Sequence, residues 1–265
     1  MKEYIKKKIA EGRKLTKLTW DEGVEIRSDQ QLKITCPPLV KDKMADVQID
    51  LPYNFNDLKM NNNFLQIIQN RKSHRMYTGE KMSLLQLSFL LYATQGIKSI
   101  RQPNATFRTV PCGGARHEFE TYFIVRDVEE LKNGAYHYLP MSHQIELINE
   151  IENIEKTIET SVNGQAWANK CNVLIYWSAI PYRSEWRYSI WAHRPLLMDI
   201  GHVCQNLYLA AEAIGLGTCG LASFSADYCA PIFKLDNEDE YIIYCAPVGV
   251  IDSKNEDPFV PITLK

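Results

Sequence analysis

The sequence predicts a fold class that mixes helices with strands, because both patterns recur along the chain. Four stretches are rich in aromatic and β-branched residues, as strands are: residues 118–125, 134–139, 172–180 and 240–250. The clearest helix covers residues 196–214, where apolar side chains recur every three or four positions. The 45% hydrophobic and 23% charged composition is typical of a globular protein with a substantial core.

Charge and cysteine content exclude several classes. The formal net charge is −2 and no long basic face is visible, so we expect no nucleic-acid partner. The seven cysteines form no CxxC pair and no metal-type spacing, which favours free thiols in a reducing cytoplasm and no metal site. Residues 1–17 are basic but lack the apolar core of a signal peptide, and no apolar run could span a bilayer, so we expect no membrane association.

The first 50 residues are polar and mixed. A short helix is predicted near Lys6–Leu18, followed by irregular chain that contains Pro37 and Pro38. We interpret residues 1–50 as an extension or arm, not as a domain. A second short helix is predicted around Phe64–Gln69.

A basic turn follows that second helix. Arg71, Ser73 and Arg75 lie within five residues, together with a lysine and a histidine. Arginines form forked charge-assisted hydrogen bonds and a serine adds a hydroxyl, so the turn suits a bound phosphate. A solvated basic turn is the alternative, and for an isolated motif it would be favoured.

The middle of the chain contains a helix and a glycine turn. Ser83 to Gln86 is a capping-box start for a helix that ends at Gly96. A polar loop is predicted for Lys98–Thr106, and the Pro111–Gly114 segment predicts a tight turn where backbone can approach a ligand closely. Residues 144–147 are a further strand, and residues 149–170 have helical periodicity.

Two features near the end of the chain need interpretation. The apolar run 172–180 predicts a central strand. The segment Gly215–Gly220 satisfies the dinucleotide pattern G-x-G-x-x-G, but a helix precedes it where that fingerprint needs a strand. Gly215 is better explained as a left-handed helix terminator. Residues 251–265 are expected to be a loop or an exchanged arm.

Several motifs occur together in a fixed order. They are Arg71-x-Ser73-x-Arg75, the helix at 87–96, Val110–Glu118, Tyr136–Tyr138, Gly201–Leu207 and Ala213–Gly217. In order and spacing they resemble the FMN-dependent nitroreductase superfamily, and within it the branch of SagB-type (thiazole/oxazole-forming) dehydrogenases. The resemblance covers roughly residues 50–250.

The resemblance implies an α+β fold: a mainly antiparallel central sheet flanked by helices, in an intertwined homodimer. It implies a nitroreductase-like FMN-binding domain over residues 51–265. Two FMN molecules would sit at the dimer interface, with both subunits lining each site and NAD(P)H as the reductant.

The resemblance also implies which residues contact FMN. Arg71 and Ser73 would hold the phosphate and ribityl chain, and Arg75 would lie near the phosphate or the pyrimidine end of the flavin. Arg75 is then the first choice for stabilising negative charge on the reduced ring. The other implied contacts are Pro111, Cys112, Gly113 and Gly114 along the ring, Gly217, Thr218, Cys219 and Gly220 on its opposite side or N5 edge, and Lys254 at the phosphate.

Two positions depart from the family pattern. Cys112 stands where a serine is common, and a thiol is a weak donor. The azoline-oxidising members carry a Lys-Tyr pair where this chain has Arg187-Tyr188, our candidate catalytic pair. Arginine cannot lose its proton as a buried lysine can, which puts azoline oxidation in doubt.

The function implied is hydride transfer through flavin N5 in a ping-pong cycle, from NAD(P)H to a nitro, quinone or similar acceptor. Two alternatives stay open: an azoline dehydrogenase that tailors a ribosomal peptide, and a non-catalytic flavin-binding scaffold. The substrate is therefore a small molecule or a peptide. His117 and His202 could be acid–base groups, but a structural role is the commoner outcome for such histidines.

Overall fold

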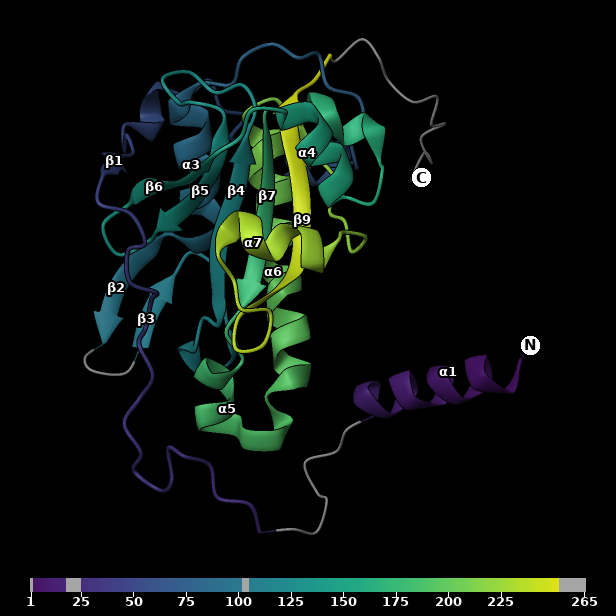
Figure 1. The fold of residues 1–265 in the computed structure, drawn as a ribbon. Helices are drawn as coiled ribbons and strands as arrows, with labels where there is room; N and C mark the ends of the chain where they lie inside the picture. The colour runs from purple at the N-terminus through teal and green to yellow at the C-terminus, as the bar shows by residue number, and fades with distance from the viewer. Residues whose placement is uncertain (1, 18–24, 102–104, 253–265) are drawn as a thin grey trace, which may run out of the picture.

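The centre of the molecule is a seven-stranded sheet with the order β1–β6–β5–β4–β7–β9–β8 (Figure 1). The computed structural model describes residues 2–17, 25–101 and 105–252. Every pair of neighbouring strands in this sheet is antiparallel, which confirms the expected sheet type. The strands are β1 Gln48–Asp50, β4 Phe119–Val125, β5 Gly134–Leu139, β6 Gln144–Glu150, β7 Val173–Ala179, β8 Leu216–Thr218 and β9 Tyr241–Val250.

Helices cover both faces of the sheet (Figure 1). One core lies between the sheet and the pair α3 and α6, and a second lies between the sheet and the pair α4 and α7. The helices of the described residues are α1 Glu3–Thr16, α2 Phe64–Asn70, α3 Leu84–Gln95, α4 Ile154–Ser161, α5 Tyr182–Tyr188, α6 His193–Ala213 and α7 Ala226–Phe233.

Strand β7 is central, as predicted. It pairs with β4 on one side and β9 on the other, and all seven of its residues are buried. Its alternate side chains enter different cores: Ile175 and Trp177 face α3 and α6, while Leu174 and Tyr176 face α4 and α7. A strand covered on both faces reads as a continuous apolar run, which is why the sequence revealed it.

The two long helices follow the sequence signals. Ser83 and Gln86 form the expected capping box at the start of α3. The Asn206 side chain of α6 donates to the Ala93 carbonyl of α3 at 2.9 Å and so fixes one helix against the other. After α6, Gly215 has φ +72°, which confirms the left-handed terminator.

Two local predictions were wrong, and one edge strand was missed. The polar loop expected at Lys98–Thr106 belongs to a hairpin of β2 Ile97–Arg101 and β3 Ala105–Arg108. The helix expected over 149–170 is confined to α4, because β6 continues to Glu150 and pairs with β5. The Gly215–Gly220 run contains β8, which lies at the edge of the main sheet. The β2–β3 hairpin and β8 contain glycine or polar residues among their apolar ones, so neither showed a strand pattern in the sequence.

Residues 28–50 pack on the sheet instead of extending from it. Two buried carboxylates receive backbone donors from this segment: Lys41 N donates to Glu120 Oε1 at 2.8 Å, and Met44 N donates to Glu146 Oε2 at 2.8 Å. His137 lies between these carboxylates, 2.8 Å from Glu146 and 3.5 Å from Glu120. Helix α1, by contrast, has no buried residue. The division into residues 1–50 and 51–265 stays a prediction.

None of the helices that the structure describes is both long and apolar enough to cross a bilayer. The expected tail 251–265 lies outside the described residues beyond Asp252, and so does Lys254.

Truncation separates the two parts of the N-terminal segment. Removing residues 2–17 should change the free energy of unfolding by no more than about 0.5 kcal/mol, because α1 buries nothing. Removing residues 2–46 takes the backbone donors from Glu120 and Glu146, which keep Arg183 and His137 as partners, so the cost should be about 1.5–3 kcal/mol for each lost hydrogen bond to a charged group. Urea unfolding measures both. Equal stability of the two truncated proteins would show that the segment is dispensable.

Candidate functional site

The basic turn lies along the edge strand β8. After α2 ends, His74 N donates to the Thr218 carbonyl at 2.9 Å, which continues the pairing beyond the sheet. A Cβ at Gly217 would lie 2.7 Å from His74 Cβ and 2.4 Å from Ile251 Cγ2, so only glycine allows this approach. The structure therefore brings the turn at 71–75 and the segment 217–220 together, although about 145 residues separate them in sequence.

Tyr208 of α6 links the two segments. Its hydroxyl lies 2.9 Å from Ser73 Oγ and accepts a hydrogen bond from Gly220 N at 2.8 Å. The Arg71 guanidinium lies 5.3 Å from the centre of the Tyr208 ring, within cation–π range. Sequence reasoning missed Tyr208, which sits beside the apolar stripe of α6 and carried no motif.

The two arginines of the turn rest on aromatic faces. Arg75 lies 5.9 Å from the Trp167 ring centre and is exposed, while Arg71 is half-buried. The pKa of Glu212 is raised by burial, and the neighbouring Lys72 and Arg71 counteract that shift. The name arginine half-site is used below for Arg71, Ser73, Arg75, Tyr208 and Gly217–Gly220.

A second group of predicted residues gathers at the start of α6. Gly113 N donates to Asp199 Oδ2 at 2.7 Å, which ties the Pro111–Gly114 turn to the helix. Gly114 has φ +59°, and a Cβ there would lie 2.5 Å from Tyr188 Oη and 2.7 Å from Arg187 Cδ. The turn and the Arg187-Tyr188 pair are thus in direct contact. The name cysteine half-site is used for Pro111–Gly114, Arg187 and Tyr188.

Cys112 is held as a neutral thiol. Its Sγ donates to Glu118 Oε2 at 3.0 Å and accepts from His117 N at 3.0 Å. Burial, and then the neighbouring Glu118, raise the pKa of Cys112 well above its usual value. Burial also raises the pKa of Glu118. A thiol held in this way is a poor nucleophile, because the thiolate is the reactive form.

Cys112, Glu118 and Asp199 form a cluster whose possible ligand atoms all lie within 4.8 Å of one another. Cys112 donates to Glu118, and Asp199 accepts from Gly113 N, so all three of these groups are already engaged. Metal binding would require the protonated thiol to ionise. The expectation of no metal stays a prediction.

The two candidate histidines have different surroundings. His117 is buried, and burial together with the positive charge of Arg108 lowers the pKa of His117 to about 3, so the ring is neutral at pH 7. His202 is half exposed on α6, with Nδ1 3.4 Å from Asp199 Oδ1. The neutral ring of His117 carries no charge and has one donor and one acceptor nitrogen.

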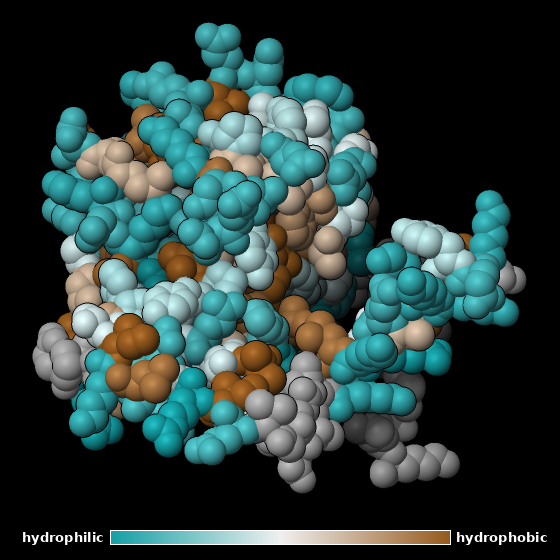
Figure 2. Space-filling view, turned by 60° about the horizontal axis from the view of Figure 1, so that its bottom comes forward, coloured by the Kyte–Doolittle hydropathy of each residue, from teal (hydrophilic) through white to brown (hydrophobic). Residues whose placement is uncertain are grey.

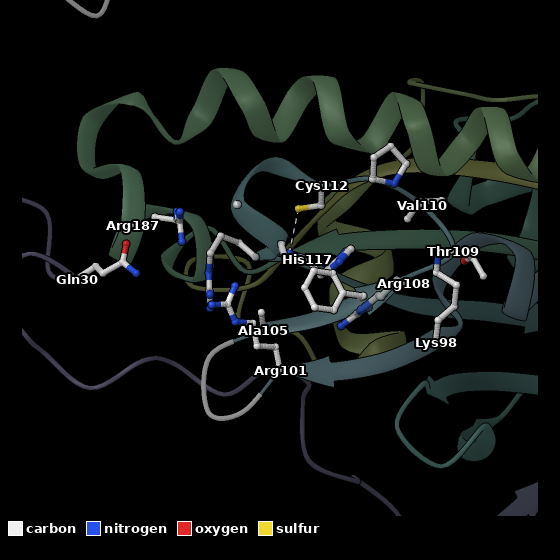
Figure 3. A pocket seen from close by; sticks show the side chains of 15 residues that line it. Gln30, Lys98, Arg101, Ala105, Arg108, Thr109, Val110, Cys112, His117 and Arg187 are labelled. Carbon is white, nitrogen blue, oxygen red and sulfur yellow. Dashed lines mark hydrogen bonds between the residues drawn. The ribbon is translucent and has the colours of Figure 1, made fainter.

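A cavity of about 940 Å³ opens beside Cys112. Figure 3 shows Arg187 and Gln30 on one side of it, Lys98 and Thr109 on the other, and Cys112 with His117 between them. The β2–β3 hairpin that sequence analysis missed forms part of its wall. The cysteine half-site thus faces a volume in the range of small-molecule pockets.

The two half-sites contact α6 at different positions along its axis. Asp199 contacts the cysteine half-site, and Tyr208, nine positions later, belongs to the arginine half-site. At 1.5 Å per residue the two positions are about 13 Å apart along the helix axis. One chain therefore presents two separate groups of candidate ligand-binding residues.

Comparisons of this sequence with known proteins agree on one family. The nitroreductase family profile matches residues 68–250. MJ1384 of Methanocaldococcus jannaschii, provisionally described as a nitroreductase, is 30% identical over 203 residues, covering 77% of this chain and 96% of that protein. The microcin B17-processing protein McbC of Escherichia coli is 27% identical over 139 residues, covering 51% of this chain and 51% of McbC.

Solved structures share the fold. A provisionally identified nitroreductase of Ralstonia eutropha superposes with a TM-score of 0.62 at 23% identity, covering 78% of this chain and 90% of that one. A chain of the E. coli microcin synthetase McbBCD complex, with truncated pro-MccB17 bound, gives 0.58 at 19% identity, covering 91% and 87%. A provisionally identified nitroreductase of Desulfovibrio desulfuricans in complex with FMN gives 0.51 at 18% identity, covering 76% and 94%.

The raised pKa of Cys112 can be checked by alkylation. The thiolate fraction sets the rate, so in the folded protein the labelling rate of Cys112 should keep rising about tenfold per pH unit up to roughly pH 10. In the urea-unfolded protein the rate should level off above about pH 8.5, the ordinary cysteine pKa. Mass spectrometry after timed iodoacetamide exposure measures both, with Cys112→Ser as the control for peptide assignment. A plateau near pH 8.5 in the folded protein would show an ordinary thiol.

Proposed function

Because this chain belongs to the nitroreductase family of oxidoreductases, we propose that it is an FMN-dependent enzyme that uses NAD(P)H to reduce a nitro, quinone or similar acceptor. The observation that carries this proposal is the arginine half-site, where a basic turn and a glycine segment remote in sequence lie against each other. We place the enzyme in the cytoplasm, in keeping with its seven free cysteines.

The arginine half-site fits the phosphate end of FMN. Arg71 and Arg75 provide two cations, and Ser73 adds a hydroxyl whose position Tyr208 fixes. Close packing at Gly217 and Gly220, where a Cβ would lie 2.4 Å from a neighbouring atom, restricts these two positions to glycine. Lys254 would add a further cation.

The cysteine half-site fits the ring end. When bound, FMN supplies the two-electron redox centre, and hydride enters and leaves it at N5. Gly113 and Gly114 let backbone approach a flat ring, and the Asp199 carboxylate holds that turn in place. Tyr188, in contact with Gly114, is placed to donate a hydrogen bond or a proton to an acceptor. Arg187 stays charged, so it can orient an anionic group but cannot act as a base.

We further propose that a homodimer completes each site. The half-sites of one chain lie about 13 Å apart along α6, so a second copy could place its cysteine half-site against the arginine half-site of the first. Apolar side chains that would be buried by such pairing are exposed on two helices: Phe64 and Leu65 of α2, each 66% exposed, and Leu197 and Met198 of α6, 48% and 52% exposed.

Peptide tailoring is the second candidate. It is supported by the similarity to McbC and to a chain of the McbBCD complex. Against it stands Arg187, since oxidation of an azoline requires removal of a proton and arginine has no basic form at neutral pH. Small-molecule reduction needs no such base, so we favour it.

Replacing Arg71 by Ala tests the phosphate assignment. Loss of a charge-assisted hydrogen bond costs about 1.5–3 kcal/mol, so FMN should bind roughly 10- to 100-fold more weakly. Fluorescence titration of the apoprotein with FMN measures the change. Arg13→Ala, on the exposed helix α1, is the matched control and should bind FMN normally. Unchanged FMN affinity in the Arg71 variant would refute the assignment.

Mixing two inactive variants tests whether a site spans two chains. Arg71→Ala disables the arginine half-site, and Gly114→Val disables the cysteine half-site by forcing a side chain into Tyr188 at a positive φ. In a mixed dimer the intact arginine half-site of one chain meets the intact cysteine half-site of the other, so one of the two sites is complete. Random pairing makes about half of the dimers mixed, so about a quarter of all FMN sites should be restored.

Coexpression with two affinity tags isolates the mixed dimer, and its flavin absorbance gives the result. If each site lay within one chain, the mixed dimer would bind no more FMN than either variant alone.

A further inference from the structure

The cavity beside Cys112 collects positive charge, although the whole chain has a formal net charge of −2. Among its described lining residues five are cationic and none is an aspartate or glutamate. The cationic residues are Lys98 and Arg101 on the β2–β3 hairpin, Arg187 on α5, and Arg108 and Arg116 on the cavity floor.

Three of these cations are exposed at the cavity. Lys98, Arg101 and Arg187 have no carboxylate within 4.0 Å among the residues that the structure describes. Some exposed lysines elsewhere have such partners: Lys8 lies 2.9 Å from Glu11, and Lys132 lies 2.8 Å from Glu150. The charge at the cavity is therefore left available for a ligand.

The floor of the cavity adds a buried cation. Arg108 is only 3% exposed, yet its guanidinium donates to neutral acceptors, the Gln95 side chain at 2.8 Å and the Leu39 carbonyl at 3.1 Å. Burial lowers the pKa of Arg108 to about 10, which still leaves it charged at pH 7. The nearby Glu120 carboxylate opposes that shift in pKa, but Glu120 is already paired with Arg183, and a buried charge acts over a longer range than a solvated one.

The nearby acidic groups do not line the cavity. Glu118 and Asp199 accept hydrogen bonds from Cys112 Sγ and Gly113 N. Glu120 forms an ion pair with Arg183 at 2.5 Å.

Figure 2 brings forward the end of the molecule that is lowest in Figure 1, where hydrophobic residues form only small patches among hydrophilic ones. Low-dielectric walls lined by one sign of charge concentrate counter-ions.

We propose that this cavity selects an anionic acceptor, a nitroaromatic or quinone compound that carries a carboxylate or a similar negative group. The inference rests on the proposed function and names its substrate class. Phe107, Val110 and Pro111 line the same cavity and can pack against an aromatic ring. Cations on both sides of the cavity, Lys98 on one and Arg187 on the other, would attract its charged substituent (Figure 3). The volume of about 940 Å³ accommodates such a molecule.

The test compares a charged probe with its uncharged isostere. Isothermal titration calorimetry of the full-length protein as purified, without reductant, measures the binding of para-nitrobenzoate and para-nitrobenzamide. At low salt the carboxylate should bind at least about tenfold more tightly, a difference of about 1.4 kcal/mol. The preference should shrink at high salt, where exposed charges are screened. Equal affinities at low salt would overturn the proposal.

Charge reversal locates the effect. Lys98→Glu and Arg101→Glu should each reduce the preference several-fold, and the double variant should abolish it. Both residues are exposed, so the fold should tolerate the changes. Lys7→Glu, on the exposed helix α1, makes the same change in net charge and should keep the full preference. A preference that the double variant retains would contradict the assignment.

Two other outcomes would contradict the proposal. If the double variant raises only the KM for NAD(P)H and leaves the acceptor preference intact, the cations bind the reductant and the proposal fails. If the small probes do not differ and only an acidic peptide responds to the substitutions, the proposal fails in favour of a peptide partner. The FMN content of the same samples reports separately on the proposed function.

Discussion

The packing of α6 against the sheet is the constraint on which the site depends. Leu196, Ile200, Val203 and Leu207 form a stripe that is buried against the sheet and α3. Because that stripe fixes the rotation of the helix, it also fixes where Asp199 and Tyr208 lie, at its beginning and in its second half. The first positions the glycine turn and the second positions the basic turn. Two distant parts of the chain are thus oriented by one rigid element.

The interior of the fold could be predicted from sequence, since burial leaves a periodic pattern. Strands β4, β7 and β9 and the helices α3 and α6 were recognised because long apolar runs and three-and-four spacing rarely arise outside buried strands and helices. The hairpin β2–β3 and the edge strand β8 were missed for the converse reason. These strands are short and mix apolar residues with polar ones or glycine, and tertiary pairing, which no local pattern records, makes them strands.

The candidate site was predictable in its motifs but not in its supports. Arg71, Ser73 and the Pro111–Gly114 turn stood out through residue type and spacing. Tyr208 and Asp199, which hold them, are ordinary residues whose partners lie far away in sequence: 135 positions separate Ser73 from Tyr208, and 86 separate Gly113 from Asp199. The hydrogen bond to Glu118 favours a packing role for Cys112, since a thiol that donates to a buried acid is a poor nucleophile.

The central proposal is that each FMN molecule is bound between two copies of the chain, so that a dimer holds two. Analytical ultracentrifugation that follows protein and flavin absorbance together tests it most directly. The account predicts a single yellow species of twice the 30.6 kDa chain mass, with one FMN per chain. A colourless monomer that stays colourless and monomeric after incubation with excess FMN would contradict it.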